Sequence, residues 1–273
     1  MTATLTEPGV TALGPRPRFR DTLLCERTKL RTVRSTWWTL FAVFAVTLAF
    51  GAIVTAAIVG RWDRMSVAQR LAIDPTARSL TGFMLSQLFI GVLGVLAITS
   101  EYSGGMIRST LAAMPHRRQL LAAKAISLAP PVFLVGAVSA LLAFLSGQAI
   151  LSNKGIGVSL GAPQEWRAVL GAGLVLALEA LIALGLGAMI RQTAGAIASY
   201  VGVLLVAQLI LSALPDPYGR DITEYFPFNA GRALMKVHTS PDLLPPWSGL
   251  AVLVVWAVVS LGVAGWLITR RDA

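Results

Sequence analysis

Six apolar runs, each long enough to cross a membrane, constrain this 273-residue chain more than any other feature. Because an α-helix rises about 1.5 Å per residue, roughly 20 apolar residues span the hydrocarbon core of a bilayer. The runs cover about 38–60, 79–100, 125–152, 168–190, 195–214 and 247–269, and they lack the polar faces that buried helices of a soluble protein would need. Charged residues make up 13% of the chain, against about 25% in soluble domains. The sequence therefore predicts an all-α, polytopic membrane protein with six transmembrane helices.

The distribution of basic residues predicts the orientation of the chain. With the N-terminus inside the cell, the cytoplasmic segments hold 14 Lys and Arg residues and the external loops hold 9. Because an excess of Lys and Arg marks the cytoplasmic side, we expect a multi-pass protein of the cell (plasma) membrane with both termini in the cytoplasm. The net charge of +10 is then explained by topology and by attraction to anionic lipid, and a nucleic-acid partner is not expected.

Several kinds of chemistry are excluded by the residues present. Cys25 is the single cysteine, so the chain forms neither an intrachain disulfide nor a cysteine metal cluster. His116 and His238 fall on opposite sides of the predicted membrane and cannot share a metal ion. No G-x-x-x-x-G-K-[ST] sequence occurs, so ATP binding through a P-loop is not expected. The sequence predicts a protein that is not an enzyme.

The segment before the first apolar run is amphipathic. Residues 1–18 are rich in Thr, Pro and Gly and are predicted to be a flexible cytoplasmic tail, whereas the apolar side chains of 19–37 fall on one helical face beside a face of arginines. This pattern predicts a helix in the cytoplasmic interface, with a merely basic flank of the first span as the alternative. Glu26 falls on the apolar face, where it either pairs with an arginine or meets another protein surface.

A 24-residue loop, EYSGGMIRSTLAAMPHRRQLLAAK (101–124), separates the second and third runs. The fourth and fifth runs, on the same side, are joined by a tight turn at 191–195. A minimal connection would suffice, so the long loop predicts contact with something outside the bilayer. We expect a short helix at Met106–Met114, preceded by a turn at Gly104-Gly105 and ended by Pro115, and a third span kinked or broken at Pro130-Pro131.

Glu179 lies in the middle of the fourth run, where a carboxylate is costly and therefore a candidate for function. Three interpretations stay open. Glu179 packs helices by hydrogen bonding to Gln87, Gln208 or Tyr200, or it lines a translocation path with Gln87 and Gln208, or it relays protons. On the external side, the stretch FPFNAGRALM (226–235) predicts a short interfacial or re-entrant helix, which Asn229 is able to cap.

Three stretches resemble, in order and spacing, the membrane subunits of bacterial type-2 ABC transporters, the ABC-2 permeases of antibiotic and multidrug export. They are ERTKLRTVRSTWWTL (26–40), the loop 101–124 and FPFNAGRALM (226–235). The resemblance implies one ABC-2 transmembrane domain over 19–273, with an elbow helix at 19–37, a coupling helix after the second span and an external re-entrant segment before the sixth.

The resemblance also implies roles for individual residues. The elbow residues would be Glu26, Lys29, Arg31 and Arg34. The residues docking on an ATPase would be Glu101, Tyr102, Gly105, Arg108, Leu111, Pro115, Arg117 and Arg118. The external cap of the transporter would include Phe226, Pro227, Phe228 and Asn229.

In such a complex this chain would be a non-catalytic subunit that forms the substrate path of an ATP-driven exporter. Its partners would be two copies of an ABC ATPase, a second permease subunit in a homodimer or heterodimer, and membrane lipid. ATP and Mg²⁺ would be bound by the ATPase, so no cofactor is expected on this chain. The alternatives are a secondary transporter that works without an ATPase and a membrane scaffold or sensor that transports nothing.

Overall fold

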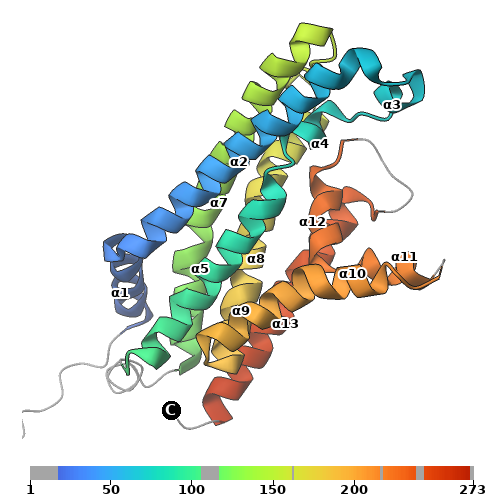
Figure 1. Cartoon of the computed structure of the whole chain (residues 1–273). Coiled ribbons are helices and arrows are strands. Elements are labelled where there is room, and N and C mark those ends of the chain that lie inside the picture. Colours follow the sequence, from blue (N-terminus) through green and yellow to red (C-terminus); the bar gives the residue numbers. More distant parts are fainter. Residues whose placement is uncertain (1–17, 106–116, 162, 216–217, 238–242, 271–273) are drawn as a thin grey trace, which may run out of the picture.

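The computed structural model describes residues 18–105, 117–161, 163–215, 218–237 and 243–270, and every regular element in these ranges is a helix (Figure 1). Six helices are long and apolar enough to span a membrane, as the sequence predicts. They are α2 (Arg34–Arg61), α5 (Phe83–Ser103), α7 (Arg117–Leu151), α8 (Pro163–Ile190), the composite of α9 (Thr193–Val201), η3 (Gly202–Val206) and α10 (Ala207–Leu211), and α13 (Pro246–Arg270).

Helix α8 forms the centre of the bundle. It packs against α5, α7 and α13, and it is the most buried of the six spans. Small residues permit this close approach: a Cβ added at Gly173 of α8 would lie 2.7 Å from the carbonyl oxygen of Phe133 in α7. The core around α8 is built mainly from aliphatic side chains that the surrounding spans contribute.

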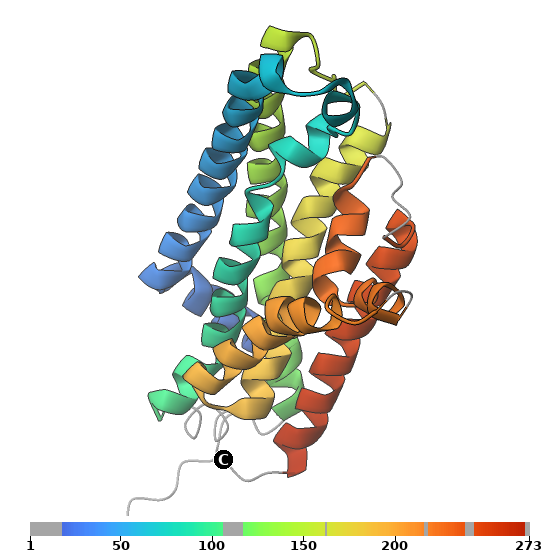
Figure 2. The ribbon, with the colours of Figure 1, turned by 45° about the vertical axis from the view of Figure 1, so that its right-hand side comes forward.

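The bundle has two ends, which we name by their short helices. The α1 end contains α1 (Phe19–Thr32), the last turn of α5, the first turn of α7 and the last turn of α13 (Figures 1 and 2). The α4 end contains η1 (Trp62–Arg64), α3 (Val67–Leu71), α4 (Pro75–Ser79) and η2 (Ser152–Lys154). The start of α1 and the end of α13 lie at the same end, which agrees with an even number of spans.

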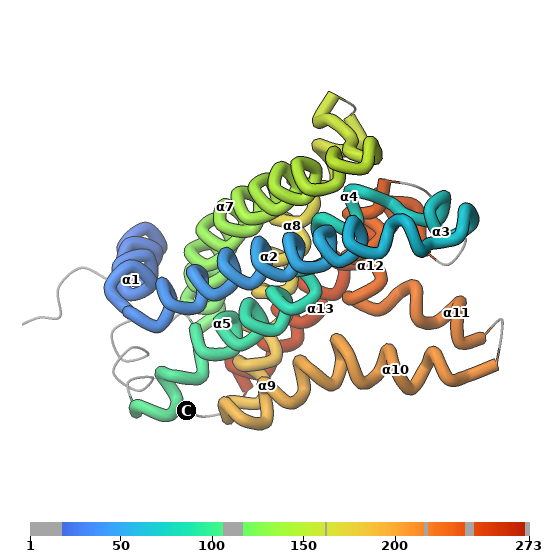
Figure 3. Tube along the Cα trace, turned by 45° about the horizontal axis from the view of Figure 1, so that its top comes forward, coloured from blue at the N-terminus to red at the C-terminus, as the bar shows by residue number. Residues whose placement is uncertain are grey.

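The fifth span differs from the others in its packing. It is interrupted by the π-helical turn η3, and α10 continues to α11 (Tyr218–Thr223) at the margin of the bundle rather than inside it (Figures 1 and 3). Leu209 and Ile210 are largely exposed there. Beyond α11, helix α12 (Pro227–Met235) packs against α8 and α13 (Figure 2).

Two predicted boundaries are wrong in detail. The amphipathic helix ends at Thr32, not at 37, because Val33 adopts an extended backbone (φ −78°, ψ 112°) and a new helix begins at Arg34. Of the two alternatives for the third span, kinked or broken at Pro130-Pro131, the break is wrong, since α7 runs through both prolines from Arg117. In a membrane helix, neighbouring segments and local adjustment satisfy the backbone groups that a proline frees, so proline is tolerated there.

The capping role predicted for Asn229 is also wrong. Phe226 is the N-cap of α12, and Asn229 lies inside the helix. The Asn229 side chain instead donates a hydrogen bond to the carbonyl oxygen of Thr223 (3.1 Å), which ties α12 to the end of α11. Pro227 at the first helical position fixes the start of α12, because its φ suits a helix and it lacks the N–H that would be unsatisfied there.

Candidate functional site

Four charged side chains from three helices meet at the α1 end and form what we call the charge cluster: Glu26, Lys29, Glu101 and Lys124. Lys124 of α7 lies 2.8 Å from Glu26 of α1 and 2.6 Å from Glu101 of α5. Lys29 of α1 lies 2.9 Å from each of the same two carboxylates. Lys124 Nζ also donates to the carbonyl oxygen of Ala97 in α5 (3.1 Å). The cluster therefore joins the amphipathic helix to the second and third spans.

The charges balance within the cluster, and three of its members are buried. Glu26, Glu101 and Lys124 are 2%, 3% and 4% exposed, so each would be costly without its partners. Burial by itself lowers the pKa of Lys29, but hydrogen bonds and attraction to Glu26 and Glu101 outweigh this effect and raise the pKa above its usual value. Lys29 is therefore charged at any physiological pH. The arginine partner expected for Glu26 is not found among the described residues: its partners are Lys29, one turn away in α1, and Lys124 of α7.

In the sequence, Glu101 and Lys124 of the charge cluster stand on either side of the segment 106–116. This segment contains the predicted coupling helix, and it lies outside the described residues together with Arg108, Leu111 and Pro115. Before this segment, the ring of Tyr102 stacks under the guanidinium of Arg191 (5.4 Å). After it, Arg117 Nη1 donates to the carbonyl oxygen of Ile268 in α13 (2.9 Å). The residues on either side of 106–116 in the sequence thus contact the turn between α8 and α9 and the last turn of α13.

The remaining residues predicted at this end lie on the surface. Gly105 ends the described part of the loop with φ +69°, a left-handed conformation that favours glycine. Arg118 is exposed in the first turn of α7, and Arg31 is exposed at the end of α1. Arg34 belongs to α2, where it is exposed, and not to the amphipathic helix.

A second polar group lies inside the bundle around Glu179. The Tyr200 hydroxyl is 3.1 Å from the carbonyl oxygen of Gln87 and 3.5 Å from Glu179 Oε2, so it joins α9 to α5 and α8. Glu179 is fully buried. Of the three partners considered from the sequence, the structure brings Tyr200 to Glu179. Gln208 lies in α10, and its Oε1 atom accepts no hydrogen bond from the described residues.

The predicted external residues fall on and beside α12. Phe228 and Asn229 are buried, whereas the Phe226 ring packs 5.9 Å from the ring of Trp256 in α13. Trp256 Nε1 also donates to the carbonyl oxygen of Tyr225 (2.9 Å). Trp256, in the middle of the sixth span, therefore contacts Tyr225 and Phe226, the two residues that precede α12.

Lys124 is the functional candidate that sequence reasoning missed. Lys124 is the last residue of the predicted loop 101–124, but it lies 4% exposed inside α7. The sequence does contain a signal that Lys124 has a specific role. It is one of four lysines in a chain with 19 arginines, and it immediately precedes the third apolar run. Its two carboxylate partners are 98 and 23 residues away in sequence, and only the fold brings them together.

The six spans and their apolar packing define a polytopic helical membrane protein. The family model described as ABC-2 family transporter protein matches residues 22–211, more than two thirds of the chain, and the chain therefore belongs to the ABC-2 transporter family. The matched region contains the whole charge cluster as well as Glu179 and Tyr200. A comparison with curated proteins gave no match. Membership in the family makes the chain the membrane permease component of a transporter, with an ABC ATPase as the partner that the family implies.

Proposed function

We propose that this chain is the transmembrane subunit of an ATP-driven exporter, and that the α1 end receives the motion of a separate ATPase. The observation that supports this most directly is the charge cluster. It connects α1, α5 and α7 through buried ion pairs at the two residues, Glu101 and Lys124, that flank the predicted coupling segment. A displacement of that segment would therefore be passed to three helices together.

The proposed mechanism rests on the contacts that tie the residues on either side of 106–116 to the bundle. ATP closes the two ATPase subunits, the segment 106–116 moves with them, and α5 and α7 follow because both flanks are tied to the bundle. Helix α1 moves with them through Glu26 and Lys29, so it acts as an elbow coupled to the spans. The spans then repack around α8, and the cargo path closes on one side of the membrane and opens on the other. The chain supplies conformational change and no covalent chemistry.

The cargo path is proposed to run beside Glu179 and Gln87, in a complex of two permease subunits and two ATPase subunits. The geometry favours helix packing as the primary role of Glu179, since Tyr200 joins it to Gln87 across three helices. The orientation proposed from the basic residues places the α1 end and both termini in the cytoplasm of the cell membrane. Gln208, in the fifth span, is proposed as a third polar residue of this path.

ATP hydrolysis by the complex tests the proposal. We expect Arg118→Glu, an exposed change in the first turn of α7, to reduce the amount of ATPase that co-purifies with the chain and the permease-dependent hydrolysis by about tenfold, because it reverses a charge at the docking surface. The matched control is Arg64→Glu, an exposed arginine at the α4 end, which should leave both quantities unchanged. Cargo movement by the purified chain in liposomes that contain no ATPase would instead establish a secondary transporter.

A further inference from the structure

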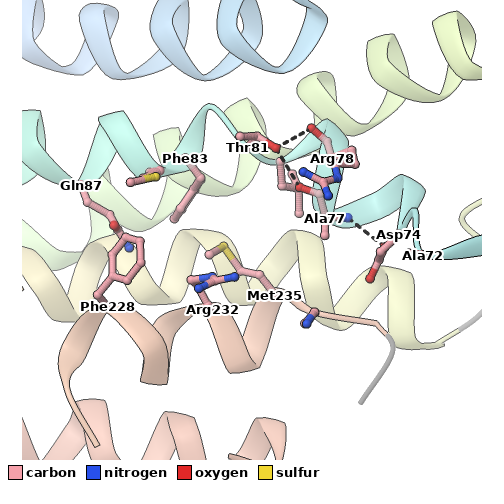
Figure 4. A pocket seen from close by; sticks show the side chains of 13 residues that line it. Ala72, Asp74, Ala77, Arg78, Thr81, Phe83, Gln87, Phe228, Arg232 and Met235 are labelled. Atoms are coloured by element: carbon pink, nitrogen blue, oxygen red, sulfur yellow. Dashed lines mark hydrogen bonds between the residues drawn. The ribbon is translucent and has the colours of Figure 1, made fainter. Parts of the chain in front are cut away.

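A cavity of about 460 Å³ lies at the α4 end, between α4, the first turns of α5 and helix α12 (Figure 4). This volume is within the range of pockets that hold small ligands. It is distinct from the charge cluster, which lies at the other end of the bundle. Figure 4 shows Phe83 and Gln87 reaching from α5 toward α12, and Phe228 and Arg232 reaching from α12 toward α5. The cavity therefore lies between two parts of the chain that are far apart in the sequence, α4 with α5 on one side and α12 on the other.

Cationic side chains dominate the polar part of the cavity. Arg78, Arg232 and Lys236 line it, together with a single acid, Asp74. Asp74 Oδ1 already accepts a hydrogen bond from the backbone N–H of Ala77 (3.0 Å), as the N-cap of α4. Within the described ranges, neither Arg78 nor Arg232 has a carboxylate oxygen within 4.0 Å. The cavity thus presents positive charge that the surrounding described residues do not neutralise.

The two arginines line the same cavity from opposite sides, α4 and α12. Loss of water around its guanidinium and the charge of Arg78 both lower the pKa of Arg232. Arg232 nevertheless stays charged, because arginine does not lose its proton in proteins. Its side chain is supported by the Phe228 ring, 5.7 Å from the guanidinium carbon. An anion placed between two such guanidinium groups removes their repulsion and accepts charged hydrogen bonds from both.

The rest of the cavity wall is mostly apolar. Phe83 and Phe228 are 1% and 8% exposed, and Met235 adds a flexible apolar side chain from α12. Gln87 lines the same cavity, is 1% exposed, and has an Oε1 atom that accepts no hydrogen bond from any described residue. A buried amide oxygen without a donor is costly, and a hydroxyl group of a ligand would satisfy it. A ligand for this cavity therefore needs an anionic group, a hydroxyl donor and an apolar part.

We propose that the cavity binds an anionic amphiphile, with its negatively charged head group between Arg78 and Arg232 and its apolar part against Phe83 and Phe228. Phosphatidylglycerol has this chemistry, since its phosphate diester carries one negative charge and its glycerol head group supplies hydroxyl donors. The proposal does not depend on the proposed transport function, because binding requires neither ATP nor an ATPase. It assigns a lipid-like ligand to the end of the bundle opposite the charge cluster.

Native mass spectrometry of the purified full-length chain in a neutral detergent tests this assignment. We expect phosphatidylglycerol to bind at least tenfold more tightly than phosphatidylcholine, and inorganic phosphate at the same concentrations not to bind. Arg78→Gln and Arg232→Gln should each weaken phosphatidylglycerol binding about tenfold, and the double variant should lose the preference over phosphatidylcholine. The control Arg64→Gln changes an exposed arginine at the same end that does not line the cavity, and it should bind as the wild type does.

A double lysine variant shows whether weaker binding comes from the lost charges or from a loss of folding. The variant with Arg78→Lys and Arg232→Lys keeps both charges and should retain the preference for phosphatidylglycerol, with an unchanged apparent melting temperature. Equal binding of the two lipids by the wild type, or an undiminished preference in the double glutamine variant, would overturn the proposal. Binding of inorganic phosphate as tight as that of phosphatidylglycerol would also overturn it, because the apolar part of the cavity would then contribute nothing.

Discussion

The variant Lys124→Met is expected to lower the apparent melting temperature of the detergent-solubilised protein by about 10 °C. Removing this ammonium group leaves Glu26 and Glu101 buried with Lys29 as their one remaining partner in the cluster. Breaking a buried ion pair by removing one partner costs about 3–5 kcal/mol, because an uncompensated charge stays in a medium of low polarity. In a chain of this size each kcal/mol corresponds to roughly 2–4 °C, and fluorescence-detected size-exclusion chromatography after heating measures the shift.

Two further variants show whether the effect comes from charge balance. The double variant with Glu101→Gln and Lys124→Met restores a neutral cluster, and its loss of stability should be smaller than the sum of the two single losses. Lys154→Met removes an exposed ion pair with Asp63 (2.9 Å) and should change the melting temperature little. If Lys124→Met melts like the wild type, the ion pairs do not hold α1 to the spans.

The variant Gly91→Val is expected to destabilise the bundle by about 3 kcal/mol or more, because the space beside Gly91 is already occupied. A Cβ at this position would overlap the ring of Tyr200, which is 3% exposed and has its hydroxyl placed between Gln87 and Glu179. Either α9 moves away from α5, or the ring rotates and its hydrogen bonds are lost. The same melting assay measures the result, with an expected decrease on the order of 10 °C.

The control for Gly91 is a glycine in an equally regular helix with free space around it. A Cβ at Gly262 of α13 meets no atom within 4 Å, so Gly262→Val should have little effect. Adding Tyr200→Ala to Gly91→Val removes the overlapping ring, and it should recover part of the lost stability. A Gly91→Val protein as stable as the wild type would show that α9 does not pack against α5 as described.

The six spans could be predicted from the sequence because membrane burial leaves a local signal. A run of about 20 apolar residues is sufficient, and no long-range pairing has to be known. The break considered at Pro130-Pro131 follows from the rule for soluble helices, where the freed carbonyl has no compensating partner, and it does not occur in this helix inside a bundle. The early end of the amphipathic helix depends on one extended residue, Val33, for which the sequence carries no turn signal.

Only part of the candidate site could be predicted from the sequence. The resemblance to ABC-2 permeases implies Glu101 and the arginines near it, and helical periodicity places the Glu26 carboxylate on an apolar face. Their common partner, Lys124, could not be identified, because the partners lie on three helices whose relative placement is set by packing. The cavity lined by Arg78 and Arg232 was missed for the same reason, since its two walls are α4 with α5 and the distant α12.

Site-specific photo-crosslinking tests the central claim, that the segment 106–116 docks on a separate ATPase. A photoreactive amino acid is placed at Leu111 in one sample and at Leu71, which is 82% exposed at the α4 end, in another. We predict that the Leu111 position captures a protein whose peptides contain a Walker-type nucleotide-binding sequence, and that the Leu71 position does not. Capture of that protein from Leu71 and not from Leu111 would contradict the account.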